Sequence, residues 1–306
     1  MKKEVETTLK ESFVYQAQVI ISRVRSEERF NTVKNYETAL RSLLRYAEAS
    51  DLSIRSITAD FVQGYQQWLK HQGISLNTIS CYTRSLRAIY NKVQRRKGKA
   101  TPFEQAYTGS PETAKRSIQA TDMRKLLKLQ LPAGSRLALS RDVFIFCFYC
   151  LGMPFIDVAF LRRNQISNGC ITYYRRKTHQ AIHIPIEPQI KEIIARYHHT
   201  QRELVFPILT QTQGVDAYSD YRRKLSQYNY DLRQLSQMAK LKTRLTSYMV
   251  RHTWASMAYE RQVDLHVISK ALGHDNPQTT LVYIRGINNR QLANANRRLL
   301  KFVTKS

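Results

Sequence analysis

Apolar residues recur at intervals of three and four through most of the first 100 residues of this 306-residue chain. That spacing places the apolar side chains on one face of an α-helix, whereas a half-buried strand would alternate apolar and polar residues. One stripe runs over residues 31–47, a second follows Thr58 and stops at Gly73, and a third begins at Asn77 and continues to Val93. With a further helix expected over residues 9–25, residues 1–100 are predicted to form a small four-helix domain.

The composition changes after this helical region. Residues 95–111 begin with a basic run and contain Gly98, Pro102, Gly109 and Pro111. Glycine and proline interrupt helices and mark loops, so we assign residues 101–116 to an interdomain linker. The second domain is then expected to span residues 117–306.

The second domain is predicted to be mainly helical with one small antiparallel sheet. Its longest apolar run, Val143–Phe155, predicts a buried helix that Ser140 caps and that ends near Gly152. Two short segments, 170–174 and 181–185, are rich in isoleucine and tyrosine and flank a basic turn at residues 175–178, a pattern typical of a hairpin. The fold class of the whole chain is therefore mainly α.

The chain carries 49 Lys+Arg against 23 Asp+Glu, a formal net charge of +26. So basic a protein is attracted to polyanions, of which nucleic acid is the first candidate and an anionic membrane the second. We exclude the membrane because the longest apolar run is too short to cross a bilayer and no apolar segment follows the N-terminal lysines.

Cysteine is sparse, at positions 81, 147, 150 and 170, which indicates a reducing cytoplasm and not a disulfide scaffold. Cys147 and Cys150 match C-x-x-C, but no second Cys/His pair lies at zinc spacing. We expect two buried thiols there, with no metal and no other cofactor.

Five segments of the second domain point to one chemistry: Leu151–Leu161, the hairpin with Lys177, Leu245–Thr253, Val267–His274 and Thr279–Tyr283. They include Arg-His-Thr at 251–253 and Leu-Gly-His at 272–274, with a tyrosine nine residues after the histidine. In this order and spacing the chain resembles a tyrosine recombinase of the phage integrase family, especially the Bacteroides-type members. The resemblance implies a SAM-like core-binding domain and a catalytic domain of the DNA breaking-rejoining fold, without a separate arm-binding domain.

The resemblance implies a role for each of four catalytic residues. Tyr283 is the expected nucleophile, which would form a 3′-phosphotyrosine with duplex DNA. A phenol needs nearby cations and hydrogen bonds to stabilise its developing oxyanion. Arg251 would hold two non-bridging phosphate oxygens with its planar fork, and His274 would donate a hydrogen bond to the same phosphate. Lys177 would protonate the 5′-oxygen leaving group.

Two neighbours of Arg251 leave alternatives open. Tyr248 stands where the family often has histidine or lysine. It is a candidate for a hydrogen bond to the phosphate or the nucleophile, and the alternative is a phenol that only packs its helix. His252 is expected to be structural, because it faces away from Arg251 on a helix.

The main departure from the family lies in the first motif. The family reads Gly-x-Arg with an acidic residue three positions later, and here Pro154 occupies the arginine position while Asp157 keeps the acidic one. A proline cannot hold a phosphate. Arg141 is our candidate for the substitute charge, and the others considered are Arg136, Arg162 and Arg163.

The resemblance also implies partners. Double-stranded DNA with short repeat-flanked core sites is the expected substrate, bound by a tetramer of the chain in the cytoplasm, at the bacterial nucleoid. Arg84 and Arg87 are candidate DNA contacts of the first domain, and Arg175 and Arg176 of the hairpin. A helix over residues 288–301 either packs on its own domain or docks onto a neighbouring protomer.

The expected function is site-specific recombination by integration, excision or inversion. The first alternative is a recombinase-like DNA-binding or regulatory protein with impaired catalysis, which Pro154 and Tyr248 favour. A type IB topoisomerase, which uses the same covalent chemistry, is a further alternative.

Overall fold

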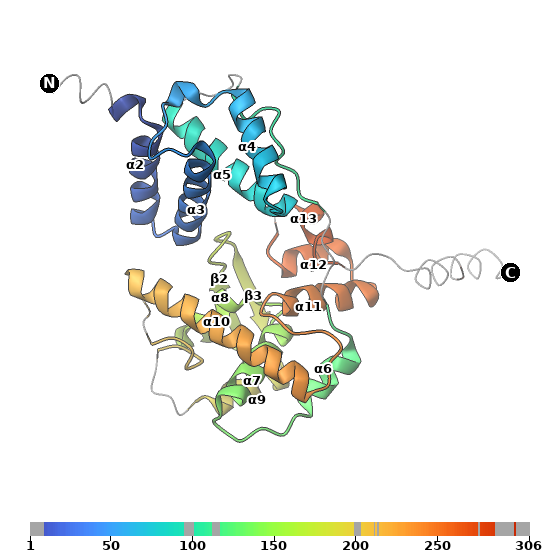
Figure 1. The fold of residues 1–306 in the computed structure, drawn as a ribbon. Coiled ribbons are helices and arrows are strands. Elements are labelled where there is room, and N and C mark those ends of the chain that lie inside the picture. The colour runs from blue at the N-terminus through green and yellow to red at the C-terminus, as the bar shows by residue number, and fades with distance from the viewer. Residues whose placement is uncertain are drawn as a thin grey trace. The chain divides into compact units, whose positions relative to one another are not determined.

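The structure is a computed structural model, and it describes residues 9–94, 101–111, 117–198, 203–210, 212, 214–274, 276–284 and 297. The chain divides into two compact units, Met1–Thr113 and Ala114–Ser306 (Figure 1). No helix among the described residues is long and apolar enough to cross a membrane. The helix predicted over residues 288–301 lies outside the described residues, apart from Arg297.

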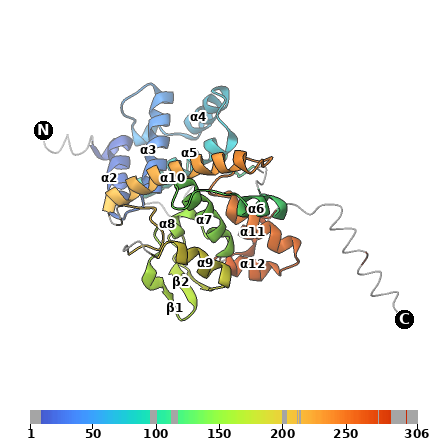
Figure 2. The same cartoon turned by 90° about the horizontal axis from the view of Figure 1, so that it is seen from below.

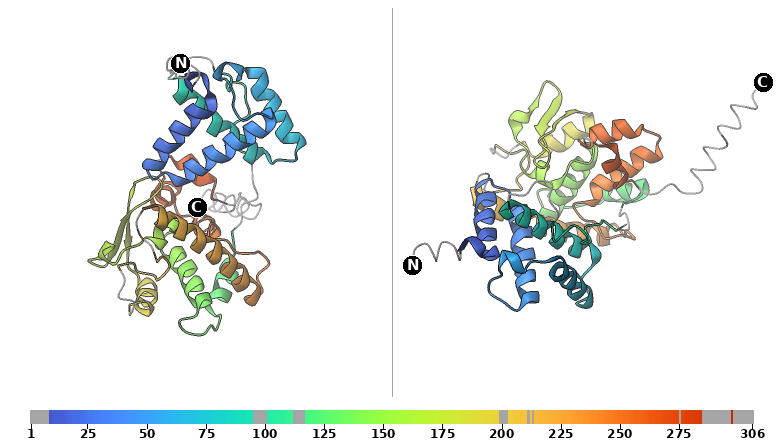
Figure 3. Two further views of the ribbon diagram at one scale, coloured as in Figure 1. Left: turned by 60° about the vertical axis from the view of Figure 1, so that its left-hand side comes forward. Right: turned by 90° about the horizontal axis from the view of Figure 1, so that it is seen from above.

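The described part of the first unit is built from four α-helices: α2 (Phe13–Ser26), α3 (Phe30–Ala47), α4 (Ala59–His71) and α5 (Leu76–Gln94). A short 3-10 turn, η1, spans Ile54–Ser56. Thr58 caps α4 as predicted, with its hydroxyl accepting a hydrogen bond from the Phe61 N–H at 3.2 Å. The apolar stripes face inward, and α3 packs against α2, α4 and α5 (Figure 3), so the four-helix prediction is confirmed.

Residues 101–111, which the sequence assigned to a linker, pack onto this first unit. Phe103 is fully buried in the helical core, with its ring centroid 5.6 Å from that of Tyr90. The buried Gln66 side chain donates to the Tyr107 carbonyl and accepts from the Tyr107 N–H, each at 3.0 Å. Residues 101–111 form no helix, but an apolar side chain and a satisfied backbone hold the segment against the core.

The second unit is organised around α7 (Arg136–Tyr149), which packs against α9 (Pro188–Arg196), α10 (Gly214–Met238) and α11 (Met249–Glu260), as Figures 1 and 2 show. The remaining helices are α6 (Ala120–Leu127), α8 (Phe155–Ala159), α12 (Leu265–Ala271) and α13 (Pro277–Leu281), with a 3-10 turn, η2, at Arg163–Gln165. Residues 143–149 of the apolar run lie in the buried helix α7 as predicted, but the helix ends at Tyr149, and residues 150–154 form a turn before α8.

The start of that helix differs from the prediction. Ser135 caps α7, and its hydroxyl accepts from the Ala138 N–H at 3.2 Å. Ser140 lies inside the helix and donates to the buried carboxylate of Asp231 at 2.8 Å. A serine at the edge of an apolar run resembles a cap in the sequence, and only the distant Asp231 shows why it is buried.

The sheet has three antiparallel strands in the order β1-β2-β3: β1 (Ile166–Ser167), β2 (Cys170–Tyr174) and β3 (Ala181–Pro185). The predicted hairpin is confirmed with the bounds expected, in the register Tyr173 opposite Ile182. The strands are visible in Figure 3. The inward positions are Ile171, Tyr173, Ile182 and Ile184, so alternate residues of both strands join the core.

Candidate active site

Three consecutive helices of the second unit bring Arg251, His274 and Tyr283 together. Arg251 lies on the first turn of α11, His274 follows α12, and Tyr283 follows α13. Gly273 ends α12 with a φ of +62°, a conformation that a residue with a side chain rarely adopts. The reversal at Gly273 returns the chain toward α11, where His274 meets Arg251.

Arg251 is 3% exposed, and its guanidinium is held by main-chain carbonyls. Nη1 donates to the Gly152 carbonyl at 3.2 Å, and Nη2 donates to the Leu272 carbonyl. The Cζ atom lies 5.3 Å from the centroid of the Tyr283 ring. Burial, and next the nearby positive charge of Arg175, lower the pKa of Arg251. A buried cation at the positive end of a helix is disfavoured by itself, so this position suits an anionic ligand.

The hydrogen bonds of His274 define its protonation. Because a guanidinium only donates, His274 Nε2 accepts from Arg251 Nη2 at 3.2 Å. The other ring nitrogen, Nδ1, then carries the proton and donates to Thr280 Oγ1 at 3.0 Å. Burial, together with the charges of Arg251, Arg175 and Lys177, lowers the pKa of His274 to about 4. Without DNA the imidazole is therefore neutral at physiological pH, with its lone pair turned to Arg251.

Tyr283 is placed by its main chain and by a second phenol. Its carbonyl accepts from His252 Nδ1 at 3.2 Å and from Ser256 Oγ at 3.3 Å. The Tyr248 hydroxyl donates to the Tyr283 hydroxyl at 2.9 Å. His252 thus holds the main chain of Tyr283, and its ring centroid lies 4.8 Å from that of the Tyr283 ring. Of the two alternatives for Tyr248, the hydrogen bond to the Tyr283 hydroxyl is the one observed.

The basic turn after β2 divides its side chains between the site and solvent. Arg175 is 6% exposed, and its Nη1 donates to the carbonyls of Leu272 at 2.7 Å and Gly273 at 3.0 Å. Arg176 is exposed, with its guanidinium 4.0 Å from the centroid of the Phe160 ring. Lys177 is exposed at the tip of the turn, within electrostatic range of His274.

The first motif, residues 152–157, contacts both Arg251 and the basic turn. Gly152 has a φ of +70°, and a Cβ there would lie 3.0 Å from the Cα of Arg251. Asp157, on α8, accepts from the Arg176 N–H at 3.1 Å and lies 3.8 Å from Arg175 Nε. Burial raises the pKa of this carboxyl, and the Arg176 N–H and the arginine charges oppose that rise. Pro154 stands just before α8, at its N-cap.

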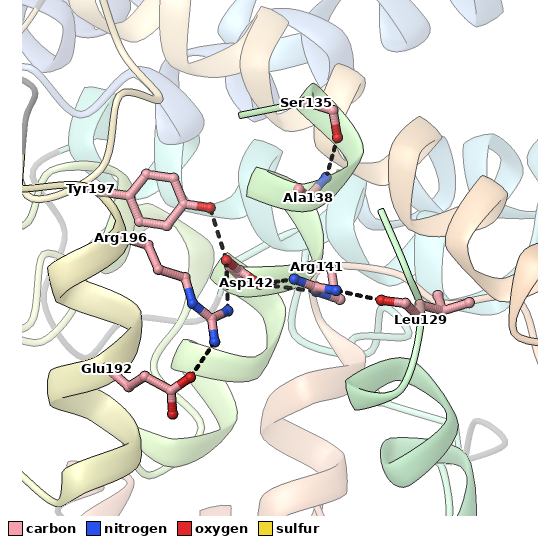
Figure 4. A network of polar contacts seen from close by, with 8 residues as sticks. All are labelled: Leu129, Ser135, Ala138, Arg141, Asp142, Glu192, Arg196 and Tyr197. Atoms are coloured by element: carbon pink, nitrogen blue, oxygen red, sulfur yellow. Dashed lines mark hydrogen bonds and ion pairs between the residues drawn. The ribbon is translucent and has the colours of Figure 1, made fainter. Parts of the chain in front are cut away.

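The structure does not bring Arg141 to this group. Its Nη1 donates to the Leu129 carbonyl at 2.7 Å and its Nε to Asp142 at 2.9 Å. Figure 4 shows that the same carboxylate accepts from Arg196 and from the Tyr197 hydroxyl. Arg141 therefore balances a buried aspartate, and the suggestion that it replaces the missing arginine is not supported.

The remaining predicted residues lie elsewhere. Arg84 and Arg87 are on α5 of the first unit, where Arg84 is exposed and donates from Nε to the Ser80 carbonyl at 3.3 Å. Cys147 and Cys150 are buried thiols as predicted, and burial raises the pKa of both.

Comparison with known proteins agrees with this arrangement. The profile of the phage integrase family matches residues 117–290, and that of the phage integrase SAM-like domain matches residues 12–108. Together the two profiles cover most of the chain. The chain belongs to the phage integrase family and is a site-specific tyrosine recombinase.

Individual relatives are distant but cover most of the chain. The tyrosine recombinase XerC of Halalkalibacterium halodurans is 27% identical over 83% of this chain and 86% of its own length. The Tn1549 transposon integrase in complex with a circular intermediate DNA superposes with a TM-score of 0.66 at 17% identity, over 92% of this chain and 99% of that one. The lambda integrase tetramer bound to a Holliday junction gives a TM-score of 0.62 at 14% identity, over 92% and 80%. At such identities the solved structures establish a shared fold.

The sequence reasoning missed the position of Arg175, which it assigned to the DNA backbone. Strand alternation carries the signal: Ile171 and Tyr173 point into the core, and Arg175 follows two residues later on the same face. The bracing contacts of Thr280 and of the Leu272 carbonyl depend on tertiary packing, and no motif marks them.

Proposed function

We propose that Tyr283 attacks the scissile phosphate of a duplex core site and forms a 3′-phosphotyrosine. As the bond between the tyrosine oxygen and phosphorus forms, the phenol proton passes to solvent water and the bond from phosphorus to the 5′-oxygen breaks. Lys177, on the exposed turn, supplies the proton that the 5′-oxygen takes up. The covalent link retains the phosphodiester energy, so the 5′-hydroxyl of a partner strand can attack it without a nucleotide cofactor.

One observation carries this proposal. The Tyr283 ring lies 5.3 Å from the Arg251 guanidinium carbon and 5.1 Å from the His274 ring. A phosphate that reaches the phenol therefore also reaches the cation that offsets charge in the pentavalent transition state. With a phosphate in place, Arg251 can exchange its bond to His274 for a bond to phosphate oxygen. The imidazole then becomes a donor by carrying its proton on Nε2.

The domain roles belong to the same proposal. Residues 1–111 bind the core site, with Arg84 and Arg87 on α5 at the DNA, and residues 117–306 carry out the chemistry, joined by residues 112–116. Four protomers on two core sites exchange strands through a Holliday junction, and the solved lambda integrase tetramer on such a junction supports this assembly. We place the reaction in the cytoplasm, on nucleoid DNA.

The test begins by selecting bound duplexes from a pool with a randomised core, because the target site has to be found first. A selected duplex, nicked beside the cleavage point so that cleavage cannot reverse, is then incubated with the protein. We expect a covalent protein–DNA band on a denaturing gel that disappears in Tyr283→Phe. The band should persist in the matched control Tyr230→Phe, which alters another partly exposed tyrosine.

Two other outcomes would change the conclusion. Tight and specific duplex binding without any covalent band would favour a DNA-binding protein with impaired catalysis. Cleavage and relaxation with no sequence preference would favour a topoisomerase.

A further inference from the structure

The site lacks the arginine that the family places at the position of Pro154, yet a second guanidinium is present. Arg175 reaches it from the end of β2, on a different element from the first motif. Its Nη1 and the Nη2 of Arg251 donate to the same oxygen, the Leu272 carbonyl. Since each nitrogen lies within a hydrogen-bond length of that oxygen, the two are at most about 6 Å apart. Two arginine forks therefore lie side by side, and one of them, Arg251, contacts both Tyr283 and His274.

The structure makes room for this side chain. A Cβ on Gly273 would lie 2.7 Å from the Cδ of Arg175, so a residue larger than glycine would displace the arginine. Asp157, the acidic residue of the first motif, lies 3.8 Å from Arg175 Nε, and the Arg175 side chain is 7% exposed. The carboxylate and the space at Gly273 hold Arg175 in one place.

The charges around Arg175 favour an anion. Arg175 and Arg251 are buried beside Asp157, with Lys177 close by on the same turn, so positive charge exceeds negative charge. Among the described residues, the Nε atoms of both arginines have no hydrogen-bond partner. Arg175 Nη2 also makes no hydrogen bond within that part of the chain. A phosphate would supply both the missing charge and the missing acceptors.

We propose that Arg175 binds a non-bridging oxygen of the scissile phosphate beside Arg251 and replaces the family's first arginine, which is absent at Pro154. This inference rests on the proposed cleavage by Tyr283. Together the two forks offset the charge that builds on the phosphate as the tyrosine attacks. Because Arg175 and Lys177 share one turn, the same hairpin delivers the phosphate ligand and the proton donor.

The test compares two scissile groups in the nicked duplex: the natural phosphodiester and a methylphosphonate, in which an uncharged methyl replaces one non-bridging oxygen. On the phosphodiester, Arg175→Ala should slow covalent cleavage by about 10²–10³-fold, the usual effect of removing one preorganised donor. DNA binding should change by less than about tenfold, since a single phosphate contact contributes little to the affinity of so basic a protein. On the methylphosphonate, the difference between wild type and Arg175→Ala should shrink to within about threefold, because the charge that Arg175 offsets is gone.

Matched variants separate this role from bracing. Lys191→Ala removes an exposed cation of α9, outside the group around Tyr283, and should cleave within about threefold of wild type. Arg175→Lys keeps the charge but loses the fork, and covers the case in which alanine prevents folding. Arg175→Lys should slow cleavage of the phosphodiester less than Arg175→Ala does, and this difference from wild type should also shrink on the methylphosphonate. Adding Pro154→Arg to Arg175→Ala should restore part of the activity.

Equal losses on the two substrates would show that Arg175 only braces the turn at Leu272, and would overturn the proposal. So would unimpaired cleavage of the phosphodiester by Arg175→Ala. Absence of any Tyr283-dependent band with the wild type would instead refute the proposed function itself.

Discussion

The hydroxyl of Tyr248 donates to the hydroxyl of Tyr283 at 2.9 Å, and this contact makes Tyr248→Phe an informative change. The residue is 57% exposed, but its hydroxyl end lies against Tyr283 inside the site. Burial, and next the hydrogen bond to Tyr283, raise the pKa of Tyr248. Its proton therefore stays in place near neutral pH, and the phenol acts as a hydrogen-bond donor and not as a base.

The size of the effect follows from this role. A neutral hydrogen bond contributes about 0.5–1.5 kcal/mol, and one to a charged group about 1.5–3 kcal/mol. The attacking oxygen carries part of a charge in the transition state, so the loss should be about 1–2 kcal/mol. At 1.36 kcal/mol per factor of ten, covalent cleavage should slow by about 5- to 30-fold.

Single-turnover cleavage of the nicked duplex measures this directly. DNA affinity and the shape of the pH–rate profile should be unchanged in Tyr248→Phe, with Tyr230→Phe as the control for loss of a phenol hydroxyl. A loss of about 10²–10⁴-fold is the range of general acid–base catalysis, and would refute the donor-only role. A rate equal to that of wild type would mean that the contact contributes nothing and that Tyr248 only packs.

Two further predictions concern residues whose surroundings the structure defines. Arg141→Ala should lower the free energy of unfolding by about 1–3 kcal/mol in urea denaturation, because the buried Asp142 loses a charged donor. The cleavage rate of the folded fraction should be unchanged. A lower cleavage rate in a fully folded variant would show that Arg141 acts in catalysis after all. An NMR titration of the DNA-free protein, assigned with His274→Gln, should place the pKa of His274 at about 4. Between pH 6.5 and 4, His274 binds a proton in the unfolded chain but stays neutral in the folded protein. The free energy of unfolding therefore decreases as the pH falls through that window. A pKa of His274 near 6.5 would contradict the buried position of His274 beside Arg251.

Local patterns predicted the elements well where one face of each element is buried. The strands 170–174 and 181–185 were expected with the bounds observed, since side chains that alternate between core and solvent mark both ends of a short strand. Prediction failed where a polar residue serves a distant partner. Ser140 resembles a cap but bonds Asp231, 91 positions away, and Phe103 resembles a loop residue but fills the core beside Tyr90.

The candidate site shows the same division. The positions of Tyr283, Arg251 and His274 could be read from the chain because the Arg-His-Thr and Leu-Gly-His motifs are local, and their spacing is set by two helices and a glycine turn. The choice between Arg141 and Arg175 could not be read in this way. Arg141 is 16 positions from Asp157 and Arg175 is 18, so separation along the chain does not distinguish them.

The sequence by itself determined the class of this protein: a basic, mainly helical chain with the tyrosine, arginine and histidine of a recombinase in order. It also determined that one expected cation is missing at Pro154. Only the tertiary structure decided that Arg141 neutralises the buried Asp142 while Arg175 enters the site beside Arg251. The physical reason is that the effect of a buried charge depends on the groups that surround it in space. Those groups come from helices and strands far apart along the chain.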